Sequence, residues 1–291
     1  MSSSPRPIPR VAAIHDLSGF GRCALAAVIP AISALGIQVC PIPTAVLSTQ
    51  TDGFENFTFR DLTQDVYPIF SHWSSLGISI DCIYSGFLGS FEQISIVRSI
   101  FEHSPGALRV VDPVMGDDGA LYATMSDEMG YRMRELCSMA DVITPNLTEC
   151  ICLLDRPYEA RPLSAGELRR HLKDLCALGA KIAVLTGVVT EDGMMANCAY
   201  DSVQGVFSEA RCPLLPRSYP GTGDLFTSVL TGLLVLGVPL SKALVHTTDY
   251  LAKTISLTIE MGTPVREGVA LERTLPLLTQ LVSPGSPLFL D

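Results

Sequence analysis

The stretch VAAIHDLSGFGRCALAA, residues 11–27, decides the fold of this chain. It begins with a short apolar run at 11–16, which is typical of a strand that is buried on both faces of a sheet. A polar, glycine-rich turn follows at 16–22, and an apolar run comes after it. A strand, a tight turn and a helix in this order predict the first half of a βαβ unit in a parallel sheet.

The same unit recurs along the 291 residues. Apolar residues with helical spacing at 62–76 and 168–178 predict helices, and Ser164 with Glu167 forms a capping box before the second of these. The predicted buried strands are 11–16, 38–46, 79–85, 108–114, 141–145 and 181–187. Alternating strands and helices predict an α/β fold, a three-layer αβα sandwich with a mainly parallel central sheet.

Other segments depart from this rhythm. Residues 194–209 predict two antiparallel strands at an edge of the sheet, and the polar, aromatic segment 47–60 predicts a small flap beside it. Further helices are expected near 240–260 and 268–282. Because no linker or repeat divides the chain, we expect one domain over 9–291, preceded by a flexible tail at 1–8.

Composition restricts the class of partner and the compartment. The formal net charge of −10 argues against nucleic acid or an anionic membrane as a partner. No run of 18 apolar residues occurs, and the first residues lack the apolar core of a signal peptide. The nine cysteines show no CxxC motif and predict free thiols. We therefore expect a soluble cytoplasmic protein.

The loops at the carboxyl ends of parallel strands gather at one edge of a sheet, where α/β proteins bind their ligands. Gly19, Gly21 and Ala24 match the dinucleotide fingerprint GxGxxA, but the expected acidic residue at the end of the second strand is missing. The P-loop motif is also missing, and no lysine precedes Lys173. A phosphate group would therefore have to be bound by backbone N–H groups and a metal ion.

The sequence GTGD at 221–224 supplies such backbone groups. Gly221 and Gly223 can turn successive amides into an anion-binding nest, and the N-terminus of the helix that follows adds its positive dipole. Asp224 could accept a proton from an attacking hydroxyl group. The alternative is that Asp224 is only the N-cap of this helix.

Three further polar residues follow predicted strands. Asp112 ends one strand, and Asn146 and Glu149 open the helix after another. Carboxylates of this kind can hold Mg²⁺ together with water and phosphate oxygens. The structural alternatives are a first-turn helix residue for Glu149 and a capping role for Asp112.

Taken together, these motifs resemble those of the ribokinase-like superfamily, and within it the pyridoxal/pyridoxine/pyridoxamine (vitamin B6) kinases. The similarity covers most of the chain and rests on AAIHDLSGFGRCALAA, SGFLGS, DPVMGDDGALY, ITPNLTE, a late LTG and GTGDLF. It implies an αβα sandwich, ATP with Mg²⁺, and a homodimer. The function it implies is ATP-dependent phosphorylation of the 5′-hydroxymethyl group of a B6 vitamer.

The resemblance also assigns residues by position. Asp224 corresponds to the catalytic base, and Gly221, Thr222 and Gly223 to the anion hole. Residues assigned to ATP are Asp112, Asp117, Tyr122, Asn146, Glu149, Thr186, Gly187 and Thr222, with Asp112 and Glu149 also assigned to the metal. Residues assigned to the vitamer are Asp16, Ser18, Thr51, Phe87 and Asp224.

Two positions depart from the family pattern: Asp16 stands where many members have serine, and the flap reads STQTDGF where many have SNHTGY. The preferred vitamer and the use of a monovalent cation are left open. Three alternative functions also remain: a hydroxymethylpyrimidine kinase, a sugar or nucleoside kinase, and a catalytically inactive vitamer-binding protein. His15 and His246 are expected to be locally hydrogen-bonded residues, and Cys212 is expected near the approach to the site.

Overall fold

The computed structural model describes residues 8–122 and 127–283 of the chain. Its strands are β1 Arg10–Ser18, β2 Gln38–Leu47, β3 Phe59–Asp61, β4 Cys82–Ser85, β5 Leu108–Val111, β6 Gly116–Asp117, β7 Ala120–Leu121, β8 Val142–Ile143, β9 Ile182–Val189, β10 Met194–Asp201 and β11 Val206–Pro213. Its α-helices are α1 Ala24–Ala34, α2 Thr63–Ser75, α3 Phe91–Glu102, α4 Asp127–Ser138, α5 Leu147–Leu154, α6 Ala165–Ala177, α7 Thr222–Val235, α8 Leu240–Glu260 and α9 Leu275–Leu281. The short 3₁₀ turns η1 Val265–Glu267 and η2 Leu271–Arg273 precede α9.

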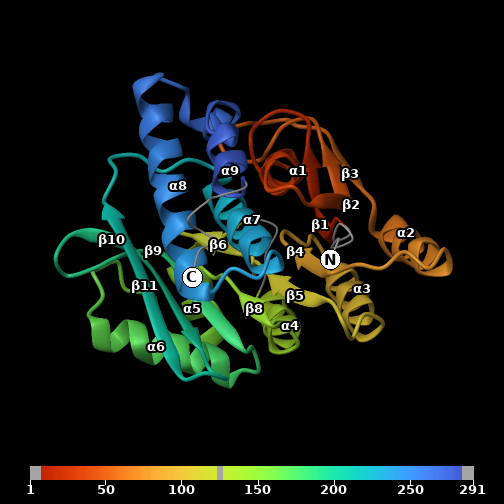
Figure 1. Ribbon diagram of the computed structural model, residues 1–291, viewed down its shortest axis with the longest axis horizontal. Helices are drawn as coiled ribbons and strands as arrows, with labels where there is room; N and C mark the ends of the chain where they lie inside the picture. The colour runs from red at the N-terminus through yellow and green to blue at the C-terminus, as the bar shows by residue number, and fades with distance from the viewer. Residues whose placement is uncertain (1–7, 123–126, 284–291) are drawn as a thin grey trace, which may run out of the picture.

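A central sheet has the strand order β11-β10-β9-β8-β5-β4-β1-β2-β3, and Figure 1 shows helices on both of its faces. The six strands from β2 to β9 in this order are parallel, as predicted. The strands β10 and β11 at one edge and β3 at the other are antiparallel. The predicted sandwich and edge hairpin are therefore confirmed, and β3 is the ordered strand of the predicted flap.

Side chains of β1 show why the central strands are apolar throughout. Val11 and Ala13 belong to the core formed with α1, α7, α8 and α9, whereas Ala12 and Ile14 belong to the core formed with α2 to α6. Successive residues of a strand point to opposite faces. Both faces of β1 are covered by helices, so every position from Val11 to Asp16 is buried.

Helix boundaries follow local signals in the sequence. The capping box of Ser164 and Glu167 opens α6, and Gly77 and Gly179 follow α2 and α6 with positive φ angles. The last helix, α9, is shorter than the predicted 268–282 because the 3₁₀ turn η2 and the residues on either side of it occupy the start of that range. No helix within the described residues is long and apolar enough to cross a membrane.

The extents of the expected domain and tail stay predictions, and residues 1–7 of that tail lie outside the described residues. All nine cysteines lie among the described residues, and none of them forms a disulfide bond.

Candidate active site

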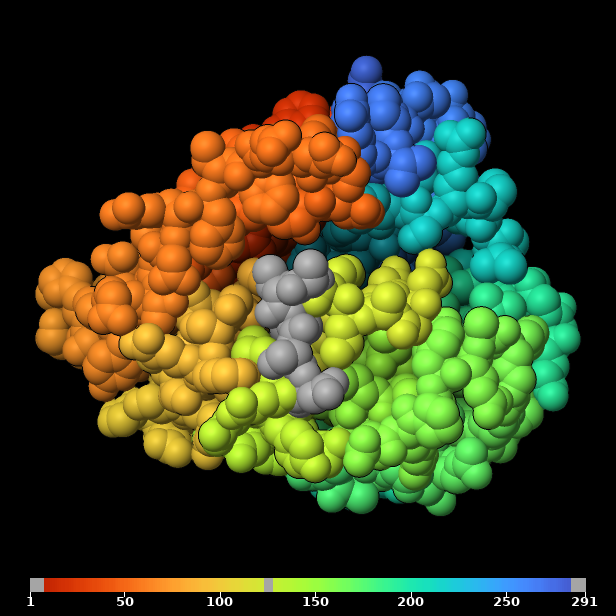
Figure 2. All heavy atoms as spheres, turned by 180° about the vertical axis from the view of Figure 1, so that it is seen from behind, coloured from red at the N-terminus to blue at the C-terminus, as the bar shows by residue number. Residues whose placement is uncertain are grey.

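The carboxyl ends of β1, β5 and β8 and the N-terminus of α7 lie at one edge of the sheet. Figure 2 shows a hollow on one face of the molecule, between the orange N-terminal third, the yellow segments near the middle of the chain and the cyan segment that precedes α7. Gly223 is exposed at the start of α7, and a Cβ atom built on it would have no neighbour within 4 Å. The space beside Gly223, in the first turn of α7, is therefore open.

Gly221 is the N-cap of α7 and has φ +80°, a value that favours glycine. A Cβ atom at this position would lie 2.0 Å from the carbonyl oxygen of Arg22. Thus the turn before α7 packs directly against the backbone that leads into α1. The Thr222 hydroxyl donates a hydrogen bond to the carbonyl of Tyr219 at 2.9 Å, which closes the turn.

Asp224 lies in the first turn of α7 and does not cap this helix, so the N-cap interpretation is wrong. Its Oδ2 atom accepts a hydrogen bond of 2.8 Å from the backbone N–H of Ala24, at the N-terminus of α1. The carboxylate therefore joins the N-termini of two helices, and both dipoles favour its charged form. Its side chain is 15% exposed, so part of it remains accessible to solvent.

The same contact argues against dinucleotide binding by the GxGxxA sequence. The Ala24 N–H would face the pyrophosphate in that type of site, but it is already bound to Asp224. Gly21 has φ +102°, and a Cβ atom there would lie 2.5 Å from Cγ of Gln50. The glycines of this loop therefore serve close packing against the segment after β2.

Burial and mutual repulsion disfavour the charged forms of the carboxylates at this edge. Burial, and then the charge of Asp16, raise the pKa of Asp224 to about 7, against the hydrogen bond from Ala24. Burial raises the pKa of Asp16 to about 6. The pKa values of Asp112 and Glu149 are also raised, first by burial and then by the charges of Asp224 and Asp112, respectively. Such an acidic cluster attracts cations.

Asp112 follows β5 and is 4% exposed. Its Oδ2 atom lies 3.2 Å from the hydroxyl of Thr227, which is one helical turn beyond Asp224 on α7. The same hydroxyl lies 2.9 Å from Oγ1 of Thr144, after β8. Asp112 is therefore fixed by side chains from two other elements and does not cap its own turn.

Glu149 and Asn146 form a capping box at the start of α5, so the helix-opening role of Glu149 is real. Glu149 has a second task, because its Oε1 atom also accepts the backbone N–H of Met115 at 3.1 Å. The Asn146 side-chain amide donates to the carbonyl of Gly116 at 2.8 Å. Together these residues hold the loop after Asp112 against α5.

Asp112 and Glu149 together supply too few ligands for a metal that is bound by protein atoms alone. Two carboxylates suit Mg²⁺, which takes its other ligands from water and phosphate. The described residues contain no group of three or more His, Cys, Asp or Glu side chains that could hold a metal. Mg²⁺ is usually held by one or two carboxylates together with water and phosphate oxygens. Each carboxylate oxygen of Glu149 accepts one backbone hydrogen bond, so each keeps a lone pair that can accept a hydrogen bond from a metal-bound water.

The hairpin of β6 and β7 carries Asp117, which is exposed, and leads to Tyr122, which is 44% exposed. Burial raises the pKa of Tyr122, and the charge of Glu149 raises it further, which places this ring beside the acidic cluster. Gly119 joins the two strands with φ +80°, and its N–H donates to the hydroxyl of Thr148 at 2.8 Å.

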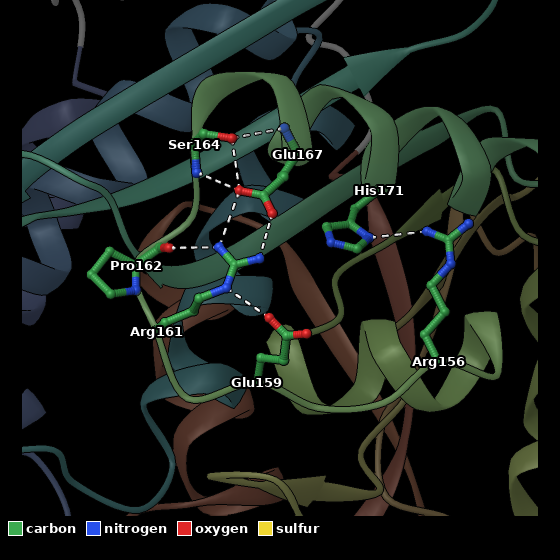
Figure 3. A network of polar contacts seen from close by, with 7 residues as sticks. All are labelled: Arg156, Glu159, Arg161, Pro162, Ser164, Glu167 and His171. Carbon is green, nitrogen blue, oxygen red and sulfur yellow. Dashed lines mark hydrogen bonds and ion pairs between the residues drawn. The ribbon is translucent and has the colours of Figure 1, made fainter.

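The loop between α5 and α6 supports this hairpin. A Cβ atom on Gly119 would lie 2.5 Å from Cδ1 of Tyr158, so the Tyr158 ring packs against the turn. Arg161 fixes the loop by donating to Glu159 at 2.7 Å and to Glu167 at 2.5 Å, as Figure 3 shows. Since Glu167 also closes the capping box of α6, the support for the hairpin is anchored to the helix layer.

Thr186 and Gly187 lie on β9 next to the start of α5. The Thr186 N–H donates to the carbonyl of Pro145 at 3.0 Å, which leaves it beside Asn146. Gly187 has φ +65°, is exposed, and donates its N–H to Asn197 at 2.9 Å. These two residues thus lie across α5 from the hairpin.

Besides Asp224, the residues assigned to the vitamer lie on three segments. Asp16 and Ser18 are buried at the end of β1, where the Ser18 hydroxyl donates to Asp16 at 3.1 Å. Phe87 is half-buried after β4, and Thr51 is exposed after β2. The backbone of this last segment is tied to the turn after β1, because the N–H of Gln50 donates to the carbonyl of Phe20 at 2.8 Å.

Two expectations for other residues need correction. His15 is not locally hydrogen-bonded: it is 0% exposed, and neither ring nitrogen has a hydrogen-bond partner within the described part of the chain. Cys212 is only 4% exposed on edge strand β11, where burial raises the pKa of its thiol, so it does not present a reactive group to a ligand. The burial of Cys212 follows from how the strands pair, which the sequence does not reveal.

Comparisons with known proteins identify the family. The model of the phosphomethylpyrimidine kinase family matches residues 21–268. This chain therefore belongs to the phosphomethylpyrimidine kinase family.

Its relatives include pyridoxal kinases. A structure from Bacteroides thetaiotaomicron, described as a phosphomethylpyrimidine kinase and crystallised with pyridoxal, is 43% identical, covers 94% of this chain and 96% of its own, and has a TM-score of 0.89. Pyridoxal kinase from Lactobacillus plantarum is 32% identical, covers 94% and 98%, and has a TM-score of 0.86. Pyridoxal kinase PdxY of Deinococcus radiodurans is 28% identical over 276 residues, 90% of this chain and 92% of the relative.

Proposed function

We propose that this protein transfers the γ-phosphoryl group of ATP to the 5′-hydroxymethyl group of a vitamin B6 vitamer. One observation carries the proposal: Asp224 joins the N-termini of α1 and α7, its side chain remains 15% exposed, and its pKa is raised to about 7. A base with this pKa is half-ionised near neutral pH, where it can accept a proton efficiently. The relatives named as pyridoxal kinases support the choice of substrate.

In this mechanism Asp224 accepts the proton of the substrate hydroxyl as its oxygen attacks phosphorus. The amides of Gly221, Thr222 and Gly223 face the transferred group and offset its developing charge. The Ala24 N–H holds one carboxylate oxygen, so the other is directed toward the substrate. Asp16, Ser18, Thr51 and Phe87 surround the pyridine ring and exclude water from it.

ATP lies along the edge from α7 to β9 in the same proposal. Asp112 and Glu149 hold Mg²⁺, which neutralises phosphate charge when bound. Residues that contact the nucleotide are Asp112, Asp117, Tyr122, Asn146, Glu149, Thr186, Gly187 and Thr222. The hairpin of β6 and β7, supported by Tyr158, covers the phosphates. We further propose a homodimer that works in the cytoplasm; use of a monovalent cation is left to measurement.

A second candidate function is phosphorylation of hydroxymethylpyrimidine or its phosphate, which the family match favours. Steady-state assays with MgATP and each of pyridoxal, pyridoxine, pyridoxamine and hydroxymethylpyrimidine distinguish the two. We expect kcat/KM for at least one vitamer to exceed that for the pyrimidine by tenfold or more. The reverse order would favour the second candidate, and ATP turnover with none of the four compounds would indicate a vitamer-binding protein without kinase activity.

We expect Asp112→Asn to stabilise the protein without Mg²⁺ while lowering its turnover. Because the pKa of Asp112 is raised, the folded state keeps a proton that the unfolded state releases, so the free energy of unfolding falls as pH rises above the ordinary carboxyl value. Removal of this charge should raise Tm at pH 8 by roughly 2–8 °C, for a gain of about 1–2 kcal/mol.

The gain should be smaller at pH 5, where the wild-type carboxyl is protonated. Thermal unfolding at both pH values measures it, with Asp249→Asn on an exposed position of α8 as the control. If Asp112→Asn and the wild type have the same Tm at pH 8, the buried charge of Asp112 does not destabilise the folded protein, which would contradict this prediction.

A further inference from the structure

His15 is a buried polar residue that the proposed mechanism does not use. It lies on β1, is 0% exposed, and neither Nδ1 nor Nε2 has a hydrogen-bond partner among the described residues. A buried polar group without a partner costs free energy, so its presence in a buried central strand requires an explanation.

Packing determines where the imidazole ring lies. The ring contacts Tyr84 of β4 edge to face, with the ring centres 4.3 Å apart. A Cβ atom on Gly86 would lie 2.1 Å from both Nδ1 and Cε1 of His15, so only a glycine at 86 leaves room for this ring. In this position Nδ1 lies 3.9 Å from Oδ1 of Asp224, which is longer than a hydrogen bond.

The two oxygens of Asp224 are therefore in different situations. Oδ2 accepts the N–H of Ala24, whereas Oδ1 is the oxygen nearest His15. We propose that His15 is a positioning residue for Asp224: with its proton on Nδ1, it donates a hydrogen bond to Oδ1 in the substrate complex and so orients the carboxylate toward the attacking hydroxyl. A movement of about 1 Å completes this bond. The inference rests on the proposed role of Asp224 as the base.

The surrounding groups make His15 a neutral donor and not a second base. Burial lowers its pKa to about 3, so the ring is uncharged at any pH at which the protein works. The titratable groups around it are Asp16 on the same strand, Asp224 on α7, Tyr84 on β4 and Cys23 before α1. None of these groups is a cation, so none of them could stabilise the Asp224 carboxylate in place of the hydrogen bond from His15.

The test compares His15→Asn with His15→Leu. Asparagine places an amide donor where Nδ1 lies, and leucine has a similar size without a donor. Because a donor favours the ionised carboxylate, its loss should raise the pKa of Asp224. We expect the acid limb of the kcat profile to move up by about one pH unit in His15→Leu, with roughly tenfold lower kcat at pH 6.5, and His15→Asn to stay within about threefold of wild type. His72→Leu, on the exposed surface of α2, is the control.

Carboxyl ¹³C NMR follows the titration of Asp224 itself in the same variants, and imidazole ¹⁵N shifts give the tautomer of His15 in the wild-type protein. The proposal expects a higher Asp224 pKa in His15→Leu only, and a proton on Nδ1. The proposal would be overturned if the Asp224 titration is unchanged in His15→Leu or if the proton of His15 lies on Nε2. An equal fall of kcat in His15→Leu and His15→Asn would also overturn it. These NMR results do not depend on turnover, so a failure of the proposed kinase activity would be seen separately in the substrate assays.

Discussion

Asp224→Asn is expected to lower kcat roughly 10²–10⁴-fold, the usual contribution of a general base, while ATP still binds with nearly wild-type affinity. The amide oxygen of asparagine can accept the Ala24 N–H as Oδ2 does, so the junction between α1 and α7 should remain intact. What is lost is the ability to take a proton from the substrate hydroxyl. Steady-state kinetics and nucleotide binding measure the two effects.

The pH profile adds a second test of the same residue. Since the pKa of Asp224 is raised to about 7, wild-type turnover should fall as pH decreases through that value, where the carboxylate becomes protonated. Asp249→Asn is the matched control, because it removes an exposed carboxylate from the neighbouring helix α8. Near-normal kcat in Asp224→Asn would mean that another group, or the solvent, accepts the proton.

Gly221→Ala should have the second large effect. A Cβ atom would meet the Arg22 carbonyl at 2.0 Å, and φ +80° is strained for alanine. The first turn of α7 must then move away from α1, which separates Asp224 from the Ala24 N–H and displaces the amides of the anion hole. Because a displacement of about 1 Å can cost 10²-fold, we expect kcat/KM to fall by roughly that factor or more.

Gly237 provides the control for this variant. It follows α7 at its other end with the same φ of +80°, but no atom lies within 4 Å of a Cβ built there. Gly237→Ala should therefore show the backbone strain alone, a loss of about 1–2 kcal/mol of stability with turnover preserved. If both variants keep full activity, the close approach of α7 to α1 is not needed for function.

Periodicity and turn signals were enough to predict the fold. The apolar runs from 11–16 to 181–187 each contain an observed parallel strand, because central strands covered on both faces must be apolar throughout. The edge hairpin of β10 and β11 was also predictable. The start of α9 was not, because the 3₁₀ turn η2 lies within the segment that was predicted as helix.

The site was predictable only in part. Motifs at strand ends and helix starts predict roles for Asp112, Glu149 and Asp224, but contacts made across the sheet left no mark in the sequence. The bond from Ala24 to Asp224 joins residues 200 positions apart. Thr227 could have been found, since it lies one turn after Asp224 on the same helix. His15 could not, because an apolar strand gives no sign that its one imidazole faces a carboxylate.

The central claim is geometrical, and a crystal structure of the protein with a B6 vitamer and a non-hydrolysable ATP analogue tests it most directly. The distance to measure is that from the 5′-oxygen of the vitamer to Oδ1 of Asp224. The account predicts about 2.6–3.2 Å, with the γ-phosphate facing the amides of residues 221–223. A 5′-oxygen turned away from Asp224, with another side chain at hydrogen-bond distance in its place, would contradict it.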